Sequence, residues 1–167
     1  NFVRKYPTDK LNPWYQNTIL TRNTGNYFEA PCDQLISMMN GKYYPFKSGT
    51  VTEDPRLPAI FTKAVATDPW MGGVNGGTGQ SSDGKPLNTY FKDGGYYTAS
   101  IAPLVLITYA EALFIKADAH FLAGGGRTTT TGTNADAYNA YKLGIAASMA
   151  QFGVSGTAYL ADTSVDV

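Results

Sequence analysis

The feature that most limits the fold is a pair of segments with apolar residues at helical spacing, joined by a Gly- and Thr-rich linker. In residues 103–123 apolar side chains recur at steps of three and four, which predicts one helix with a single apolar face. That face consists of Leu104, Ile107, Ala110, Phe114, Ala117 and Phe121. Pro103 suits the first turn, because its missing N–H needs no partner there, and the three glycines at 124–126 end the helix.

A second amphipathic segment follows the linker, over residues 135–152. Thr133 or Asn134 can cap this helix, since side-chain oxygens at that position accept from free backbone N–H groups. Its apolar face consists of Tyr138, Tyr141, Ile145, Met149 and Phe152. Residues 103–153 are therefore predicted to form an antiparallel αα-hairpin of tetratricopeptide type. The aromatic residues expected in its core are Phe114, Phe121, Tyr138 and Tyr141.

The preceding part, residues 1–102, is predicted to be rich in loops. Pro, Asn and Gly punctuate residues 1–32, which are expected to be irregular. Residues 33–40 predict one short amphipathic helix, which Gly41 ends. The stretch from 42 to 102 is longer than an ordinary connection, and such stretches in a compact domain are usually functional or disordered. Its many aromatic residues favour order.

One tetratricopeptide hairpin cannot bury its apolar face alone, because stacked neighbours normally cover it. We therefore expect a mainly α fold in which residues 1–167 form a single incomplete domain of a larger protein. An isolated chain of this sequence is expected to be unstable or to aggregate. The N-terminal residues show no signal-peptide pattern, so any export signal is expected outside this segment.

Charge and composition exclude several classes of ligand. The 13 basic and 13 acidic residues cancel, and no basic stripe exists to neutralise phosphates, so nucleic acid is not an expected partner. Only 16% of residues are charged, against about 25% in an average domain. The surface must therefore be largely neutral and polar, which suits a neutral, hydroxylated ligand.

No group of residues predicts catalysis or a metal centre. Residues 79–85 have the spacing of a phosphate-binding loop, but Pro86 replaces the magnesium-binding Ser/Thr. His120 follows Asp118, yet neighbours two apart do not share a helix face. A glycosidase pair depends on a distance between carboxylates that sequence spacing does not give. Cys32, the one cysteine, has no His nearby in the sequence. No catalytic residue, metal ligand or cofactor is therefore predicted.

Aromatic residues in the loop region carry the case for ligand binding. The flat C–H faces of sugars stack on aromatic rings, which combine apolar area with a polar group in Trp and Tyr. The candidate ligand-binding residues are Trp70, Asn75, Asn88, Tyr90, Tyr96 and Tyr97. The alternative is that half or more of these aromatics pack the loops onto the helices. Trp14, which follows Asn12 and Pro13, is left open between the two roles.

Four short segments match the patterns of one known family, in the same order along the chain. Residues 108–119 begin Thr-Tyr-Ala-Glu and continue to Ala-Asp-Ala, and residues 137–153 end in Phe-Gly. Upstream, residues 54–58 read Asp-Pro-Arg-Leu-Pro, and residues 73–76 form a Gly-rich turn. In these segments the chain resembles the SusD/RagB-like outer-membrane lipoproteins, named for the starch-utilisation system of Bacteroidetes. The family's N-terminal lipoprotein cysteine and its early helical hairpins are not in this sequence.

This resemblance implies a binding protein rather than an enzyme. Family members capture an oligosaccharide at the cell surface and deliver it to a SusC-like TonB-dependent transporter. By resemblance, a lipid anchor outside this segment would attach the protein to the outer membrane. Three alternatives stay open: a glycan-degrading enzyme, a tetratricopeptide scaffold for protein partners, and a binding protein for peptide uptake.

Overall fold

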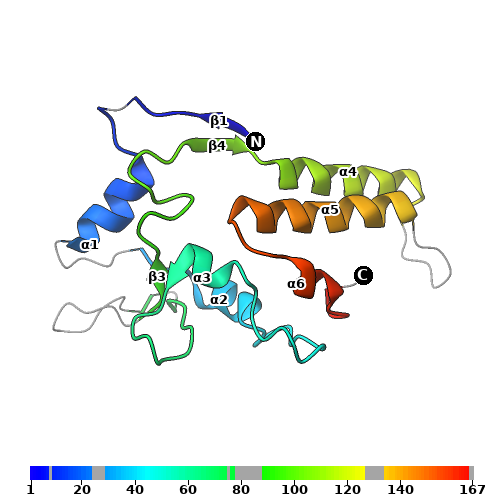
Figure 1. Cartoon of the computed structure of the whole chain (residues 1–167), viewed down its shortest axis with the longest axis horizontal. Helices are drawn as coiled ribbons and strands as arrows, with labels where there is room; N and C mark the ends of the chain where they lie inside the picture. The colour runs from blue at the N-terminus through cyan, green and yellow to red at the C-terminus, as the bar shows by residue number, and fades with distance from the viewer. Residues whose placement is uncertain (8, 24–28, 75, 78–87, 127–133, 166–167) are drawn as a thin grey trace.

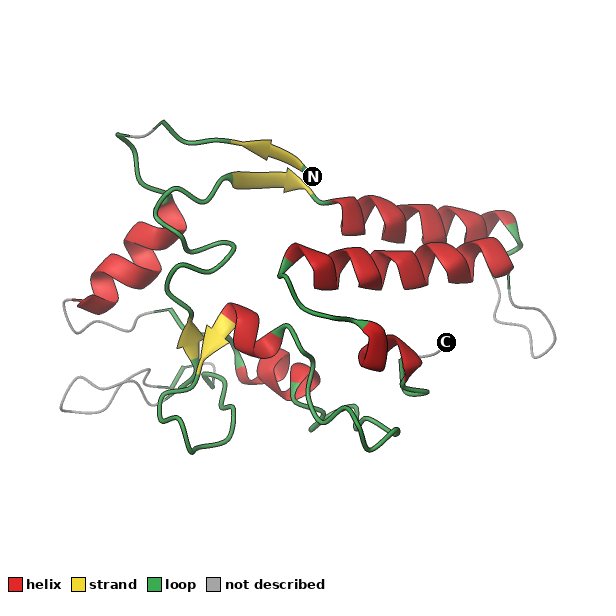
Figure 2. Cartoon of the chain, in the orientation of Figure 1, coloured by secondary structure: helices red, strands yellow, loops and turns green. Residues whose placement is uncertain are grey.

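The computed structural model describes residues 1–7, 9–23, 29–74, 76–77, 88–126 and 134–165. Helices dominate these residues, so the fold is mainly α, as predicted (Figure 1). The helical elements are η1 (Tyr15–Leu20, a π-helix), α1 (Thr21–Asn23), α2 (Asp33–Met39), α3 (Leu57–Ile60), α4 (Tyr109–Ala123), α5 (Ala135–Gln151) and α6 (Thr157–Ala161). The strands are β1 (Phe2–Arg4), β2 (Phe61–Thr62), β3 (Tyr90–Phe91) and β4 (Leu104–Ile107), which form two short antiparallel pairs (Figure 2).

Helices α4 and α5 lie side by side in opposite directions, so this part of the chain forms an antiparallel pair of helices (Figure 1), while its tetratricopeptide type stays a prediction. Gly144 allows them to approach closely, because a Cβ atom there would lie 2.8 Å from the ring of Phe114. The Phe114 and Tyr141 rings lie 6.0 Å apart between the helices. From the predicted apolar face of α5, Ile145 and Met149 are buried.

The predicted start of the first helix was wrong. Residues 104–107 form strand β4, which pairs with β1 so that Val105 lies opposite Val3. The helix begins only after Thr108, whose hydroxyl accepts from the Glu111 N–H at 2.9 Å, while the Glu111 side chain accepts from the Thr108 N–H. This capping box favours a helix start at this point. The β-branched residues before it favour a strand.

The predicted irregularity of residues 1–32 was also wrong in part. Strand β1 lies in this region because β4, about a hundred residues later, provides its hydrogen-bonding partner. The helical turns of η1 and α1 follow Pro13. Asn12 is buried and its Oδ1 accepts from the Trp14 N–H at 2.7 Å, which holds the start of these turns.

The aromatic residues assigned to the hairpin core are less buried than predicted. Phe114 is 38% exposed, and the other three are only half-buried. Ile107, expected on the packed face, is 50% exposed because it belongs to β4 rather than to the helix. Further large apolar side chains of the hairpin are exposed: Ile115, Leu122 and Leu143.

Removal of the Thr108 cap tests this helix start. Thr108→Ala is expected to lower the free energy of unfolding by about 1 kcal/mol, the usual loss when an N-cap side chain is truncated. Thr108→Ser keeps the accepting oxygen and should cost much less. Urea denaturation of both variants measures the difference. Equal losses would show that the methyl group matters rather than the cap.

Within the described residues, buried apolar side chains gather in two clusters. The first contains Ile36, Leu57 and Phe61 and joins α2, α3 and β2. The second contains Ile145, Met149 and Val165 and joins α5 to the segment after α6. The first cluster therefore organises the loop-rich region, while the second organises the hairpin side of the molecule.

The carboxylate of Asp162 connects the end of α6 to the loop before residue 51. It is fully buried and accepts from the backbone N–H groups of Lys47 at 3.1 Å and Ser48 at 2.8 Å. It also accepts from the N–H and hydroxyl of Ser164 at 2.8 and 2.5 Å. Hydrogen bonds from Ser164 and Ser48 hold the pKa of Asp162 well below its ordinary value, although burial acts in the opposite direction.

This lowered pKa predicts a loss of stability in acid. A carboxyl group whose pKa is lower in the folded state stabilises the fold above its unfolded pKa of about 3.9. This contribution to stability disappears as the pH falls through the lower pKa of the folded state. The melting temperature should therefore fall from about pH 5 to about pH 2. The Asp162→Asn variant should be less stable near neutrality, and its melting temperature should fall less steeply over the same pH range. Circular dichroism measures both melting temperatures. An equal fall with pH in the wild type and the variant would contradict this role.

The loop around Gly72 packs directly on the N-terminus of α2. The Gly73 N–H donates to the Pro31 carbonyl at 2.7 Å, and the Gly73 carbonyl accepts from the Asp33 N–H at 2.9 Å. A Cβ atom on Gly72 would lie 2.3 Å from the Asp33 Cα and 2.5 Å from the Cys32 carbonyl oxygen. Only glycine fits such a close approach of two backbones.

Candidate functional site

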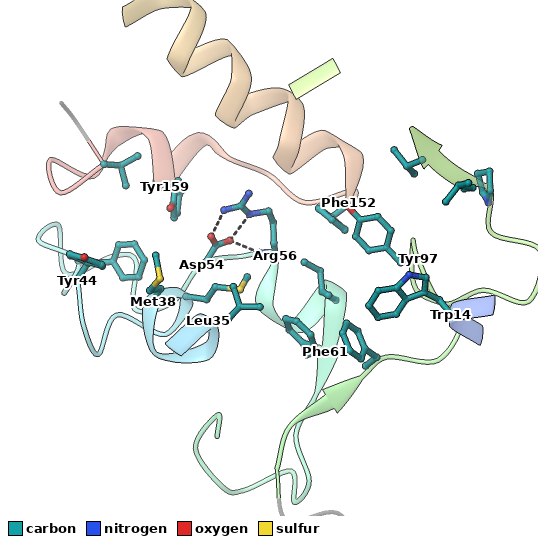
Figure 3. Close-up of a pocket in the computed structure, with 18 of the residues that line it drawn as sticks. Trp14, Leu35, Met38, Tyr44, Asp54, Arg56, Phe61, Tyr97, Phe152 and Tyr159 are labelled. Atoms are coloured by element: carbon teal, nitrogen blue, oxygen red, sulfur yellow. Dashed lines mark hydrogen bonds and ion pairs between the residues drawn. The ribbon is translucent and has the colours of Figure 1, made fainter. Parts of the chain in front are cut away.

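A cavity of about 710 Å³ opens between the loop-rich region and the C-terminal ends of α5 and α6 (Figure 3). Its walls come from segments far apart in the sequence, from Tyr6 near the N-terminus to Val165 near the C-terminus. The volume lies within the range of about 300–1,000 Å³ that is usual for small-molecule sites. The lining is mostly apolar and aromatic, with a few polar groups.

An aromatic wall forms one end of the cavity. Trp14 is 49% exposed and contacts Phe91 edge-on, with ring centroids 5.2 Å apart at 69°. The Tyr97 and Phe152 rings lie beside them, 5.7 Å from each other. Asn12 positions this wall, because its side-chain amide holds the Trp14 N–H and also donates to the Tyr97 carbonyl at 3.1 Å.

The other end of the cavity is formed by α2 and the loop that follows it. Tyr44 is 68% exposed there, near the side chains of Leu35 and Met38 (Figure 3). Phe46 and Tyr159, which also line the cavity, pack edge-on with their ring centroids 5.7 Å apart. The cavity is thus bounded at both ends by exposed aromatic rings, Trp14 on one side and Tyr44 on the other.

An ion pair between the buried Asp54 and the half-buried Arg56 provides the charged groups of the lining. The Arg56 guanidinium donates to both oxygens of Asp54, at 3.0 and 2.5 Å. Its third nitrogen donates to the Ser148 hydroxyl on α5 at 2.8 Å. Burial lowers the pKa of Arg56, but the hydrogen bond and charge of Asp54 outweigh burial, and the pKa lies above its ordinary value. Because the two charges cancel, the described lining presents no net charge to a ligand.

The predicted site residues separate into two places. The Tyr96 and Tyr97 rings form an edge-on pair beside Phe152, with their centroids 5.0 Å apart. Of the pair, Tyr97 lines the cavity. Burial raises the pKa of Tyr97, and the neighbouring Tyr96 raises it further. The Tyr97 phenol therefore keeps its proton at neutral pH. Gln151 donates to its oxygen at 3.3 Å.

Trp70 and Tyr90 are not among the residues that line this cavity, although each lies next to one that does: Trp70 packs on the cluster containing Phe61, and Tyr90 precedes Phe91 in β3. Trp70 is half-buried against the cluster of Ile36, Leu57 and Phe61, and its indole N–H donates to Glu53 at 2.6 Å. Tyr90 is half-buried, with the Arg22 guanidinium 4.6 Å from its ring centroid.

The remaining predicted residues give little further geometry. Asn88 is half-buried, with its amide near Gly73. Asn75 and the phosphate-loop-like residues 79–86 lie outside the described residues. Whether the predicted residues contact a ligand stays a prediction; among those that the structure describes, Tyr97 alone lies on the cavity wall.

Sequence reasoning did not select several residues that line the cavity. Phe152 was interpreted only as part of a helix face, and Tyr44 and Phe91 were not chosen as candidates. Trp14 was left open between the two roles, because Asn12-Pro13 before it predicts a turn but not the direction of the ring that follows. Among the described residues, no three His, Cys, Asp or Glu side chains lie close enough to hold a metal ion.

Comparison with known families gives one result. A family model with the description "Starch-binding associating with outer membrane" matches residues 2–167, nearly the whole chain. None of the curated proteins matches the sequence. Within the part of the chain that the structure describes, no helix has both the length and the apolar character needed to cross a bilayer.

Proposed function

Because the chain belongs to the SusD-like family, whose description is starch-binding and associated with the outer membrane, we propose that it binds an oligosaccharide without cleaving it. The observation that carries this proposal is the half-exposed ring of Trp14 on the wall of the 710 Å³ cavity. Sugar rings stack on such aromatic faces. The paired charges of Asp54 and Arg56 suit a neutral ligand, since neither is free to attract an ion.

We further propose that the protein works at the cell surface and passes its ligand to a SusC-like TonB-dependent transporter. Attachment to the outer membrane would come from a lipid anchor outside residues 1–167. This part of the proposal is supported by family membership. It requires no catalytic residue and no cofactor.

The hairpin supports a proposal about the whole domain. Residues 1–167 are one incomplete SusD-like domain, and further tetratricopeptide-like hairpins pack on the exposed side chains of Ile115, Leu122 and Leu143. Such neighbours are what one hairpin needs to bury its apolar face. An isolated 1–167 chain is expected to aggregate, as followed by light scattering. A monomer that melts cooperatively would contradict this proposal.

Calorimetry and a hydrolysis assay on the full-length protein test the function. Maltoheptaose, a neutral starch fragment, is expected to bind with a dissociation constant between about 1 μM and 1 mM, which corresponds to about −8 to −4 kcal/mol. The same sugar should be recovered uncleaved after incubation. Shortened chains would favour a glycan-degrading enzyme. Absence of binding, with tight binding of a peptide, would favour peptide uptake.

A further inference from the structure

A second cavity of about 460 Å³ adjoins the first at Trp14 and Phe91. Its described lining consists of Pro13, Trp14, Asn17, Glu29, Ala30 and Phe91. The larger cavity includes the same Trp14 and Phe91 side chains in its own wall. This pair of rings therefore forms part of the wall of both cavities.

The geometry of the ring pair leaves Trp14 accessible. The Trp14 and Phe91 rings meet at 69° with their centroids 5.2 Å apart, so they are not stacked face to face. Half of the Trp14 residue is exposed. The backbone of Trp14 is also held in place. Its backbone N–H donates to the Asn12 side chain, and its carbonyl accepts from the Thr18 hydroxyl at 2.6 Å.

The second cavity offers hydrogen-bonding groups beyond Trp14. Asn17 lies in the π-helix η1, which begins after Trp14, and both residues line this cavity. Asn17 and Glu29 are both exposed. An amide donates and accepts, and a carboxylate accepts strongly from hydroxyl groups. No cation is present in the described lining, so the carboxylate of Glu29 disfavours an acidic ligand.

We infer that the binding site is a continuous groove, which runs from the larger cavity past Trp14 into the smaller one. Its ligand is a neutral oligosaccharide chain long enough to occupy both cavities, with one sugar stacked on Trp14 at the junction. Asn17 and Glu29 bind the hydroxyls of the sugars beyond it. This inference rests on the proposed function and adds the length and charge of the ligand.

A chain-length series on the full-length protein tests the inference. Maltotriose and maltoheptaose are titrated by calorimetry into the wild type and into an Asn17→Ala/Glu29→Ala double variant. The double variant is expected to bind maltoheptaose about tenfold more weakly, since two hydrogen-bonding groups are removed. Its affinity for maltotriose, which is short enough for the larger cavity alone, should be unchanged. Asn139→Ala, an exposed amide on α5, is the matched control and should bind both sugars normally.

The outcomes separate the inference from the proposed function. Equal affinity of the wild type for both sugars, or an equal loss for both in the double variant, would overturn the groove and leave oligosaccharide binding standing. Preferential binding of heptagalacturonate, an acidic chain, would overturn the assignment of a neutral ligand. Failure of every sugar to bind the folded wild type would overturn the proposed function, and the groove with it.

Discussion

Replacing Trp14 with Ala is expected to weaken maltoheptaose binding about thirtyfold or more, because aromatic anchors often lose about 2 kcal/mol or more on truncation. The residue is half-exposed, and its ring meets the Phe91 ring in a T-shaped contact rather than a stacked one. Its removal should therefore leave the fold intact while removing the surface on which a sugar stacks. Calorimetry on the full-length protein measures the affinity, and a thermal melt checks the fold.

Trp70→Ala is the matched control, because it truncates the other tryptophan of the chain. Trp70 packs against the cluster of Ile36, Leu57 and Phe61 and donates to Glu53. Its loss should lower the free energy of unfolding, by up to about 3 kcal/mol for this half-buried ring, and leave the affinity nearly unchanged. The reverse result, with binding lost in a stable Trp70→Ala protein and kept in Trp14→Ala, would move the site to the loop around Trp70 and Tyr90.

Gly72→Ala is expected to have the largest effect on stability, a loss of about 3 kcal/mol or more. Overpacking typically costs about 1–3 kcal/mol and occasionally more, and here the new methyl group would meet backbone atoms of Cys32 and Asp33 rather than a side chain that can rotate. The loop would have to leave the N-terminus of α2. That movement would break both hydrogen bonds of Gly73 with this region.

Gly73→Ala provides the control at the next position. A Cβ atom there would meet its nearest neighbours at 3.6–3.7 Å, which is ordinary contact. Guanidinium denaturation should therefore give a small change for Gly73→Ala and a large one for Gly72→Ala. Equal stability of the two variants would show that the close approach of the backbones relaxes at little cost.

Local signals predicted the helices well where the chain carries them. Helix α2 was expected over 33–40 and α5 over 135–152, and both are present within a residue or so of those limits. The start of α4 was missed because the apolar spacing of Leu104 and Ile107 continues that of the helix, although both residues belong to a strand. That strand depends on pairing with β1, at the other end of the sequence, and local periodicity does not reveal such a partner.

The candidate site was harder to predict, for a related reason. Tyr97, an aromatic selected from the loop region, lines the cavity, and its contact with a ligand stays a prediction. Trp70, chosen by the same criterion, has a carboxylate partner in Glu53 and an apolar cluster beneath it. Sequence alone does not distinguish a tryptophan that packs from one that faces a cavity. The difference arises only when distant segments come together around Asn12 and Arg56.

The two ends of the larger cavity differ in how freely they can change during evolution. Near Trp14, the wall depends on the buried side chain of Asn12, so a substitution of Asn12 would disturb folding as well as recognition. Tyr44 at the opposite end is two-thirds exposed, and replacing it should cost the fold little. Descendants of this protein could therefore acquire new sugar preferences through changes around Tyr44, while the end at Trp14 keeps a common mode of stacking.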